Sequence, residues 1–317
     1  MQNEENAFFC PLSLSRYNMH KAGFVNIVGN PNVGKSTLMN RLVGEKISIA
    51  TFKAQTTRHR IMGIVNEPDC QIVFSDTPGV LKPNYKMQEM MLAFSESALA
   101  DADILLYVTD VVEDPEKNQD FLDKVKEMKI PVLLLINKID ELGKDEGNPT
   151  ERLGALVEKW HALLPNAEIL PISASNNFGV KELMKRIHEL LPESPAYFDK
   201  DQLTDKPAKF FVSEIIREKI LRYYDKEIPY SVEVVVERFK EDEHHIHINA
   251  VIYVERDSQK GIIIGHQGTA LKKVSMEARR SLEKFFGKAI YLETFVKVDK
   301  DWRNSDRELN NFGYNPE

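Results

Sequence analysis

The residues with the clearest chemical use form the segment Gly29-Asn30-Pro31-Asn32-Val33-Gly34-Lys35-Ser36, which fits the pattern G-x-x-x-x-G-K-[ST] and is followed by Thr37. Glycines at these positions let backbone N–H groups curl around phosphate oxygens, and a helix that begins there adds partial positive charge. Lys35 is placed to reach the β- and γ-phosphates, and Ser36 is placed to ligate Mg²⁺. The segment therefore predicts a loop that binds a nucleoside triphosphate.

Three shorter motifs follow, each at the end of an apolar run: Asp76-Thr77-Pro78-Gly79, Asn137-Lys138-Ile139-Asp140 and Ser173-Ala174-Ser175. Asp76 is expected to reach Mg²⁺, and the Gly79 amide is expected to bond the γ-phosphate. The Asp140 carboxylate can accept hydrogen bonds from guanine N1–H and amine, which adenine does not offer. We expect Asn137 at the other edge of the base, the Lys138 stem over it, and a backbone amide of Ser173 or Ala174 near the guanine oxygen. Motifs in this order, at the carboxyl ends of strands, predict a P-loop GTPase.

Two further positions concern hydrolysis. A threonine from the polar loop that contains Thr56-Thr57 is expected to close onto Mg²⁺; the sequence does not decide between the two, and Thr57 is taken as the candidate. Val80 stands where many GTPases have a glutamine that orients the attacking water, so we expect slow intrinsic hydrolysis or another device. The candidate catalytic residues are Lys35, Thr57, Asp76 and Gly79, and the candidate Mg²⁺ ligands are Ser36, Thr57 and Asp76.

Alternating strand and helix patterns place these motifs in a mostly parallel six-stranded sheet with helices on both faces, an α/β domain. The expected strands cover residues 24–28, 61–65, 72–74, 104–108, 132–136 and 168–171. The expected helices cover residues 36–43, 88–100, 117–128, 150–164 and 180–191. The predicted organisation is a disordered N-terminal arm at 1–18, this domain at 19–192, a proline-containing linker at 193–209 and a second domain at 210–317.

Composition limits the class of protein. The chain has 317 residues, 42% of them hydrophobic, which is enough for about two domains with cores of their own. Its apolar runs are far shorter than the ~18 residues of a membrane-spanning helix. With only 2 cysteines, a disulfide scaffold or a four-cysteine zinc site is excluded. The net charge of -7 argues against binding nucleic acid over the whole surface.

One segment of the chain has a net positive charge, unlike the chain as a whole. Residues 260–288 are strongly basic, and they contain the turn Gly265-His266-Gln267-Gly268 at a helix start. Alternating apolar residues predict strands near 232–237, 246–254 and 289–298, with helices at 213–224 and 268–286. The order helix, strand, strand, helix, helix, strand with a G-x-x-G turn predicts an α+β KH domain of type II that binds RNA. The candidate RNA-contact residues are Gly261, Ile264, Gly265, His266, Gln267, Gly268, Lys272, Lys273, Arg279 and Arg280.

The combination of these motifs resembles the Era family of bacterial ribosome-assembly GTPases over residues 19–315. The resemblance is carried also by three segments: Lys53-Ala54-Gln55-Thr56-Thr57-Arg58-His59-Arg60, Ser213-Glu214-Ile215-Ile216-Arg217-Glu218-Lys219 and Pro229-Tyr230-Ser231-Val232. It implies a cytoplasmic monomer that uses GTP/GDP and Mg²⁺ and binds the 3′ end of 16S ribosomal RNA to assist 30S subunit assembly. It also implies peripheral contact with the inner membrane, and potassium bound through Asn32 as a substitute for the missing glutamine.

Two alternatives stay open from the sequence. The chain could be a KH protein that uses GTP as a structural ligand, or a membrane-associated signalling GTPase whose KH-like domain binds protein. His244, His245 and His247 are expected to be solvated residues at a strand start rather than a metal site, and Cys70 is expected to pack in the core. A helix at 302–310 is expected to pack on the second domain.

Overall fold

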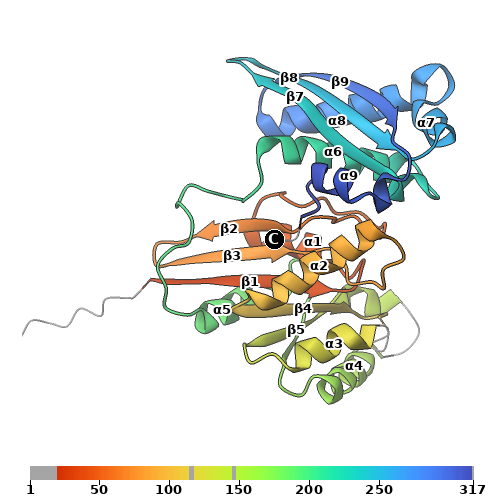
Figure 1. Ribbon diagram of the computed structural model, residues 1–317. Helices are drawn as coiled ribbons and strands as arrows, with labels where there is room; N and C mark the ends of the chain where they lie inside the picture. Colours follow the sequence, from red (N-terminus) through yellow and green to blue (C-terminus); the bar gives the residue numbers. More distant parts are fainter. Residues whose placement is uncertain (1–19, 114–117, 145–147, 316–317) are drawn as a thin grey trace, which may run out of the picture.

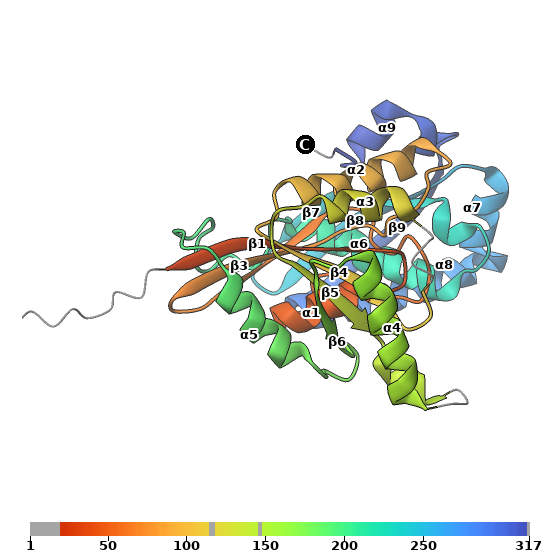
Figure 2. The same ribbon diagram turned by 90° about the horizontal axis from the view of Figure 1, so that it is seen from below.

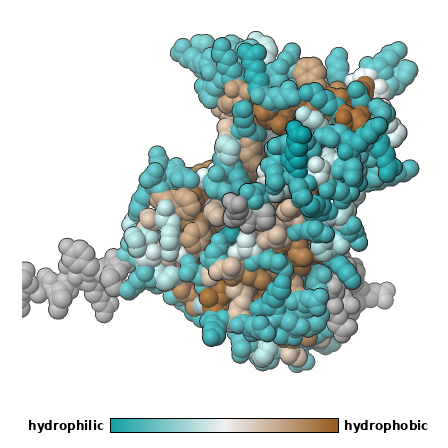
Figure 3. All heavy atoms as spheres, viewed as in Figure 1, coloured by the Kyte–Doolittle hydropathy of each residue, from teal (hydrophilic) through white to brown (hydrophobic). Residues whose placement is uncertain are grey.

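The computed structural model describes residues 20–113, 118–144 and 148–315, and it shows one domain stacked above the other (Figure 1). The predicted arm at 1–18 lies outside the described residues. The lower domain of Figure 1 contains the amino-terminal elements, and the upper domain contains the elements from α6 onward. Both lobes are visible in Figure 3, where hydrophilic side chains dominate the face toward the viewer.

The first domain is built on a six-stranded sheet in the order β2-β3-β1-β4-β5-β6. β2 runs antiparallel to β3, and every other neighbouring pair is parallel. This confirms the predicted mostly parallel sheet. The strands are β1 (Lys21–Gly29), β2 (Ile61–Asn66), β3 (Cys70–Asp76), β4 (Ile104–Asp110), β5 (Val132–Asn137) and β6 (Glu168–Pro171).

Helices cover both faces of this sheet, as Figure 2 shows from below. One hydrophobic cluster joins α1 and α5 to the sheet, and another joins α2, α3 and α4 to its opposite face. Every residue of β3 and β4 is buried, which fits strands that are covered on both sides. The helices are α1 (Lys35–Val43), α2 (Lys86–Ala100), α3 (Gln119–Lys126), α4 (Pro149–Leu163) and α5 (Val180–Leu190).

The segment expected as a linker runs along the surface of the first domain and contacts its sheet. Gly63 and Thr204 form a β-bridge, and the Gln71 side chain accepts hydrogen bonds from the backbone N–H groups of Tyr197 and Phe198 at 2.7 and 3.0 Å. The helix that follows begins at Ala208, inside the predicted linker range. The connection to the second domain is therefore fixed to the edge of the sheet.

The second domain has three strands in the order β7-β8-β9, with β7 antiparallel and β9 parallel to β8. Helices α6 and α8 pack against one face through a shared apolar core. The observed order of elements is the predicted one. They are α6 (Ala208–Tyr223), β7 (Val232–Glu241), β8 (His245–Val254), α7 (Asp257–Ile264), α8 (Thr269–Phe286) and β9 (Ala289–Val298).

Two aromatic residues near the ends of the helices of this domain are exposed. Tyr223 is 41% exposed and lies under the Lys273 ammonium, while the next residue, Tyr224, is buried and donates to the Ile263 carbonyl oxygen at 2.6 Å. Phe285 is 42% exposed. Each lies at the last turn of its helix, where the chain turns away from the core.

The C-terminal residues correct a prediction. A short 3₁₀ turn at 302–304 and helix α9 (Asp306–Asn311) replace the single helix expected at 302–310. Trp302, Leu309 and Tyr314 are fully buried in a cluster with Met87 and Met91 of α2, so this segment packs on the first domain as well as the second. No helix in the described part of the chain is both long and apolar enough to cross a membrane.

Candidate nucleotide-binding site

The phosphate loop lies between β1 and α1, at the carboxyl edge of the central sheet. Gly34 has φ of 99°, and a side chain there would place its Cβ 2.3 Å from the Asn137 side-chain nitrogen. A Cβ on Gly79 would lie 2.7 Å from the Pro31 backbone. Glycine is required at both positions because the DTPG turn and the NKID loop press directly against the phosphate loop.

Lys35 is buried and donates to the carbonyl oxygens of Gly29 and Asn30 at 2.9 and 2.8 Å. Burial lowers its pKa to about 8, although Asp76 and Glu113 oppose the shift. The ammonium is therefore held inside the loop beside the position of the phosphates. Phosphate oxygens would replace the carbonyl oxygens as its partners and favour its charged form.

The three candidate Mg²⁺ ligands gather at one point. The Ser36 and Thr57 hydroxyls lie 2.8 Å apart, and Thr57 donates to Asp76 Oδ2 at 3.3 Å. Thr56 points elsewhere, toward the Lys53 carbonyl oxygen and the Thr51 hydroxyl. The structure thus distinguishes the two threonines and places Thr57 at the candidate metal site.

The donor set suits magnesium. Asp76 Oδ1 is buried and has no hydrogen-bond partner, so one carboxylate oxygen is open for a cation. Burial raises the pKa of Asp76, and the Lys35 charge opposes that rise. Two hydroxyls and a carboxylate are oxygen ligands of the kind that Mg²⁺ prefers, with water and phosphate oxygens completing its shell.

Several residues of the nucleotide-binding loops use their side chains to hold the loops together, so they offer only backbone atoms to a nucleotide. Asn30 directs its amide toward Glu113 and Asn118. The Thr77 hydroxyl donates to the Ile27 carbonyl oxygen at 2.8 Å and ties the end of β3 to β1. Val33 and Val80 are buried in the core, so position 80 offers no side chain to a water at the phosphates. Asn32 is exposed, has φ of 68°, and lines the hollow with Thr37 and Gly79.

Asn137 makes two contacts that the motif spacing did not predict. Its buried amide donates to the Val33 carbonyl oxygen at 2.7 Å and accepts from the Ala174 N–H at 3.0 Å. The side chain therefore joins the phosphate loop to the loop after β6, and its second amide hydrogen is left for the edge of the base. The bond from Ala174 to Asn137 uses the Ala174 N–H, which was a candidate donor to the guanine oxygen.

Asp140 and Lys138 line the side expected to hold the base. Asp140 is exposed and accepts from the Ser173 hydroxyl at 2.6 Å. Lys138 has φ of 61° and donates to Asp110 at 2.6 Å, which holds its stem across the loop. Ser173 thus orients the carboxylate that is expected to read guanine, a contribution that the motif spacing did not predict.

We expect Asp140→Asn to shift preference from guanine toward xanthine nucleotides. The amide can donate to the xanthine O2, whereas the carboxylate accepts from the N1–H and amine of guanine; a mismatched buried pair costs ~1–3 kcal/mol. Competition of GTP against XTP for the purified protein measures the shift. Asn166→Asp, at an exposed site beyond α4, is the control, and an unchanged preference in Asp140→Asn would show that Asp140 does not read the base.

The G-x-x-G turn lies exposed between α7 and α8. Gly265 and Gly268 have φ of 70° and 75°, and His266 and Gln267 between them are exposed. Ile264 is half-buried against the domain core, and Lys272 and Lys273 are exposed in the first turn of α8. Arg279 and Arg280 form ion pairs with Glu283 and Glu277, so these two charges are partly neutralised within α8.

Two arginines at the interface between the domains make contacts that the sequence did not predict. Arg58, directly after Thr57, is 1% exposed and donates to the Val232 and Pro229 carbonyl oxygens at 2.6 and 2.9 Å. It also pairs with Glu233 at 3.1 Å. Arg217 of α6 is equally buried and reaches back to the Thr56 carbonyl oxygen. The loop that carries the candidate Mg²⁺ threonine is therefore bound on both sides of Thr57 to the second domain.

Known proteins share both halves of this arrangement. Residues 24–138 match a family described as 50S ribosome-binding GTPase, and residues 227–303 match the KH domain family. A crystal structure of Era in complex with MgGDPNP and nucleotides 1506-1542 of 16S ribosomal RNA is 38% identical, with a TM-score of 0.87 over 93% of this chain and 99% of that chain. A crystal structure of an Aquifex aeolicus Era variant bound to GDP.AlF4- gives the same identity, coverage and TM-score.

The similarity therefore spans both domains and the segment that joins them, not only the nucleotide-binding half. This chain also has the phosphate loop, the candidate oxygen ligands of Mg²⁺ and the exposed G-x-x-G turn. The chain is a GTPase with a C-terminal KH domain, and it belongs to the Era family.

Proposed function

We propose that this GTPase is a nucleotide-controlled RNA-binding switch that assists assembly of the small ribosomal subunit. Its first domain would bind and hydrolyse GTP, and its KH domain would bind the 3′ end of 16S ribosomal RNA. The observation that carries the proposal is the 38% identical Era structure that contains both a Mg²⁺-nucleotide and that RNA. The same resemblance carries the expectation of a cytoplasmic monomer with peripheral contact to the inner membrane. Cell fractionation tests the location of the protein.

The chemistry at the first site is positioning and charge neutralisation. Bound Mg²⁺ would supply positive charge at the β- and γ-phosphates, held by Ser36, Thr57 and Asp76. Lys35 would stabilise the negative charge that develops on the phosphate oxygens, and the Gly79 N–H would donate to the γ-phosphate. Because Thr57 reaches the γ-phosphate side only while its loop is closed, hydrolysis would loosen the loop that contacts the KH domain.

Hydrolysis is expected to run faster in KCl than in NaCl, and Asn32 is expected to be required for the difference. Val80 is buried, so no side chain at that position can orient water, whereas Asn32 is exposed at the hollow. A potassium ion held there would neutralise charge between the β- and γ-phosphates. Phosphate release at matched ionic strength measures the effect, with Asn166→Ala as the control. Equal rates in both salts would reject potassium and favour an arginine from a partner.

Two glycines on the KH domain leave space for a ligand. Nothing lies within 4 Å of the position that a Cβ would take at Gly261 or at Gly268. Gly261 lies inside α7, where glycine is ~1 kcal/mol less favourable than alanine and the fold itself does not need it. Open backbone beside an exposed turn and the N-terminus of α8 fits close approach of an RNA phosphate.

Replacing His266 and Gln267 with aspartate should weaken RNA binding at least tenfold and leave GTP affinity nearly unchanged. Two carboxylates would face the RNA phosphates, and like charges repel most strongly at short range. Gly265 and Gly268 still form the turn, so the fold should survive. Filter binding to a 16S 3′ fragment and titration with fluorescent GDP measure the two affinities.

The matched control adds the same charge elsewhere, with His161→Asp and Asn166→Asp on the first domain. Both residues are exposed near the end of α4. If both double variants bind RNA as the parent does, the turn is only a helix cap and the assignment of RNA binding to this surface fails. If both lose RNA equally, net charge and not the turn explains the loss, and the assignment fails in the same way.

A further inference from the structure

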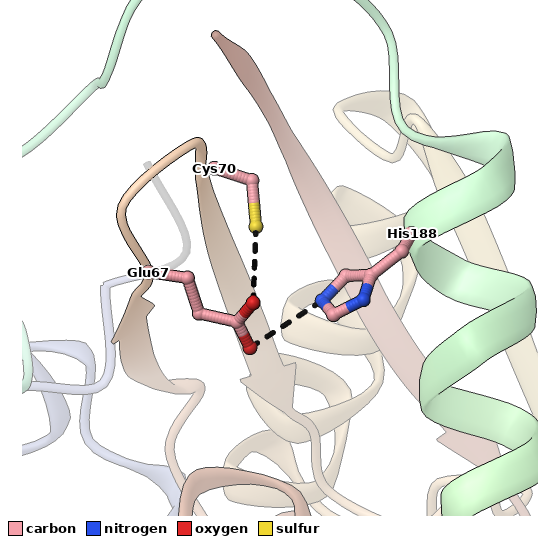
Figure 4. A group of neighbouring side chains, drawn as sticks. All are labelled: Glu67, Cys70 and His188. Carbon is pink, nitrogen blue, oxygen red and sulfur yellow. Dashed lines mark hydrogen bonds and ion pairs between the residues drawn. The ribbon is translucent and has the colours of Figure 1, made fainter. Parts of the chain in front are cut away.

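Three side chains with metal-binding atoms meet at the end of the sheet remote from the nucleotide (Figure 4). Glu67 lies in the turn between β2 and β3, Cys70 begins β3, and His188 projects from α5. β3 reaches the nucleotide site only at its other end, with Asp76. The group is therefore separate from the GTPase chemistry and has no role in it.

The atoms are spaced close to the separations that a tetrahedral zinc shell requires. Cys70 Sγ lies 3.8 Å from Glu67 Oε2, and His188 Nε2 lies 3.5 Å from Glu67 Oε1. All the ligand atoms lie within 4.8 Å of one another. With Zn–S of about 2.3 Å and Zn–N and Zn–O near 2.1 Å, tetrahedral geometry separates sulfur from oxygen by about 3.6 Å and nitrogen from oxygen by about 3.4 Å. The sulfur and the nitrogen face different oxygens of the Glu67 carboxylate, so the side chains would shift for one ion to bind all three residues.

The histidine supplies a second, independent observation. His188 Nε2 is buried and makes no hydrogen bond, even though it faces the carboxylate of Glu67. An unsatisfied buried nitrogen is unfavourable unless something unseen completes it. The rest of the ring is accessible, since 36% of the His188 side chain and 37% of the Glu67 side chain are exposed. An ion could thus enter from solvent and bind Nε2, which makes only a 3.5 Å contact with Glu67 and no hydrogen bond.

The backbone around the group is already fixed. Lys21 donates to the His188 carbonyl oxygen at 3.0 Å, and Lys200 donates to the Glu67 carbonyl oxygen at 3.4 Å. Cys70 is 5% exposed at the start of β3, where its strand is paired with β1. Ligands held in this way lose little conformational freedom when they bind a metal.

We propose that Glu67, Cys70 and His188 form a binding site for Zn²⁺, with water as the fourth ligand. A thiolate, an imidazole and a carboxylate together suit zinc, whereas Mg²⁺ and Ca²⁺ take oxygen ligands. On binding, the Cys70 thiol releases its proton to solvent and its sulfur bonds the metal, with no change of oxidation state. The ion would join the β2–β3 turn to α5, just before the segment that leads to the KH domain.

Cobalt titration of metal-free protein tests the site, because a Co²⁺–thiolate bond gives a charge-transfer band in the near ultraviolet. The titration uses full-length Cys10→Ser protein, so that Cys70 is the only thiol. We expect the band to saturate at one equivalent and to be displaced by Zn²⁺. Cobalt at the oxygen ligands of the nucleotide site, or at the histidines of β8, would give no such band.

Variants separate the three ligands. Cys70→Ser should abolish the band, and His188→Gln and Glu67→Gln should each weaken Co²⁺ binding at least tenfold, while His161→Gln on α4 should leave it unchanged. Fluorescent-GDP affinity in every variant controls for folding. Absence of the band in Cys10→Ser, its survival in Cys70→Ser, or unchanged affinity in His188→Gln would each overturn the proposal.

Discussion

Replacing Lys35 with alanine is expected to lower kcat/KM for GTP by ~10²–10³-fold, a loss of the size seen when one donor to a developing negative charge is removed. Lys35 is the cation placed inside the phosphate loop, held there by the Gly29 and Asn30 carbonyl oxygens. Its loss also leaves Asp76, which is fully buried, without the positive charge that opposes the rise in its pKa. We therefore expect weaker Mg²⁺ binding together with slower phosphate release.

The matched control for Lys35→Ala is Lys124→Ala. Lys124 forms a surface ion pair with Glu96 and lies outside the nucleotide site, so its removal should change the rate less than twofold. Phosphate release over a range of GTP concentrations, with GDP affinity measured in parallel, gives kcat/KM and separates chemistry from binding. If Lys35→Ala binds GTP normally and the parent protein releases no phosphate, GTP is a structural ligand and the proposed switch is rejected.

The sequence predicted the parts of the site that are local in the chain. The phosphate loop, DTPG and NKID are short segments whose backbone geometry is set by their own residues, and parallel strands bring their ends to one edge. It did not predict the contacts that side chains make with partners far away in the sequence. Asn137 bonds Val33 and Ala174, and Thr77 bonds Ile27, because strand ends that neighbour in space compete for the same polar groups.

Helix α6 shows a second reason for failure. Periodicity assigns charged residues to the solvent side, but Glu214, Arg217 and Glu218 are buried there. Glu214 accepts two hydrogen bonds from Arg217 at 2.7 and 2.6 Å, and Glu218 pairs with Lys46 of the first domain at 2.8 Å. Charges can be buried when each is paired, and a pattern search on hydropathy does not detect pairing. The three segments that carried the family resemblance are those that meet at this interface.

His59 shows how tightly that interface is closed. Burial lowers its pKa to about 4, so the ring is neutral at physiological pH. It stacks against Tyr314 from the C-terminal segment, with ring centroids 4.5 Å apart, and lies near Phe94 and Phe210. An uncharged, half-buried histidine among aromatic rings adjoins Arg58, which is fully buried between the domains. A movement of the Thr57 loop would therefore disturb contacts with the KH domain.

The sharpest test of this coupling is Arg58→Met, which removes one partner of the buried pair and leaves Glu233 charged and enclosed. Burial alone would raise the pKa of Glu233, but Arg58 and Arg217 hold it below its usual range. Breaking such a pair costs about 3–5 kcal/mol, so urea unfolding should show a loss of that size. Arg186→Met, which breaks exposed pairs with Glu168 and Glu189, should cost less than about 1 kcal/mol.

The double variant Arg58→Met with Glu233→Gln distinguishes a stranded charge from a lost contact. The glutamine side chain would be neutral and could still accept from the Tyr314 hydroxyl, which donates to Glu233 at 2.7 Å, so much of the stability should return. Coupling should not return, because no arginine would bind the carbonyl oxygens of Pro229 and Val232. We expect the parent to bind the 16S fragment differently with a GTP analogue and with GDP, and the double variant to lose most of that difference. If the stable double variant keeps the full difference, the signal passes by another route, and the Arg58 contact serves only to join the domains.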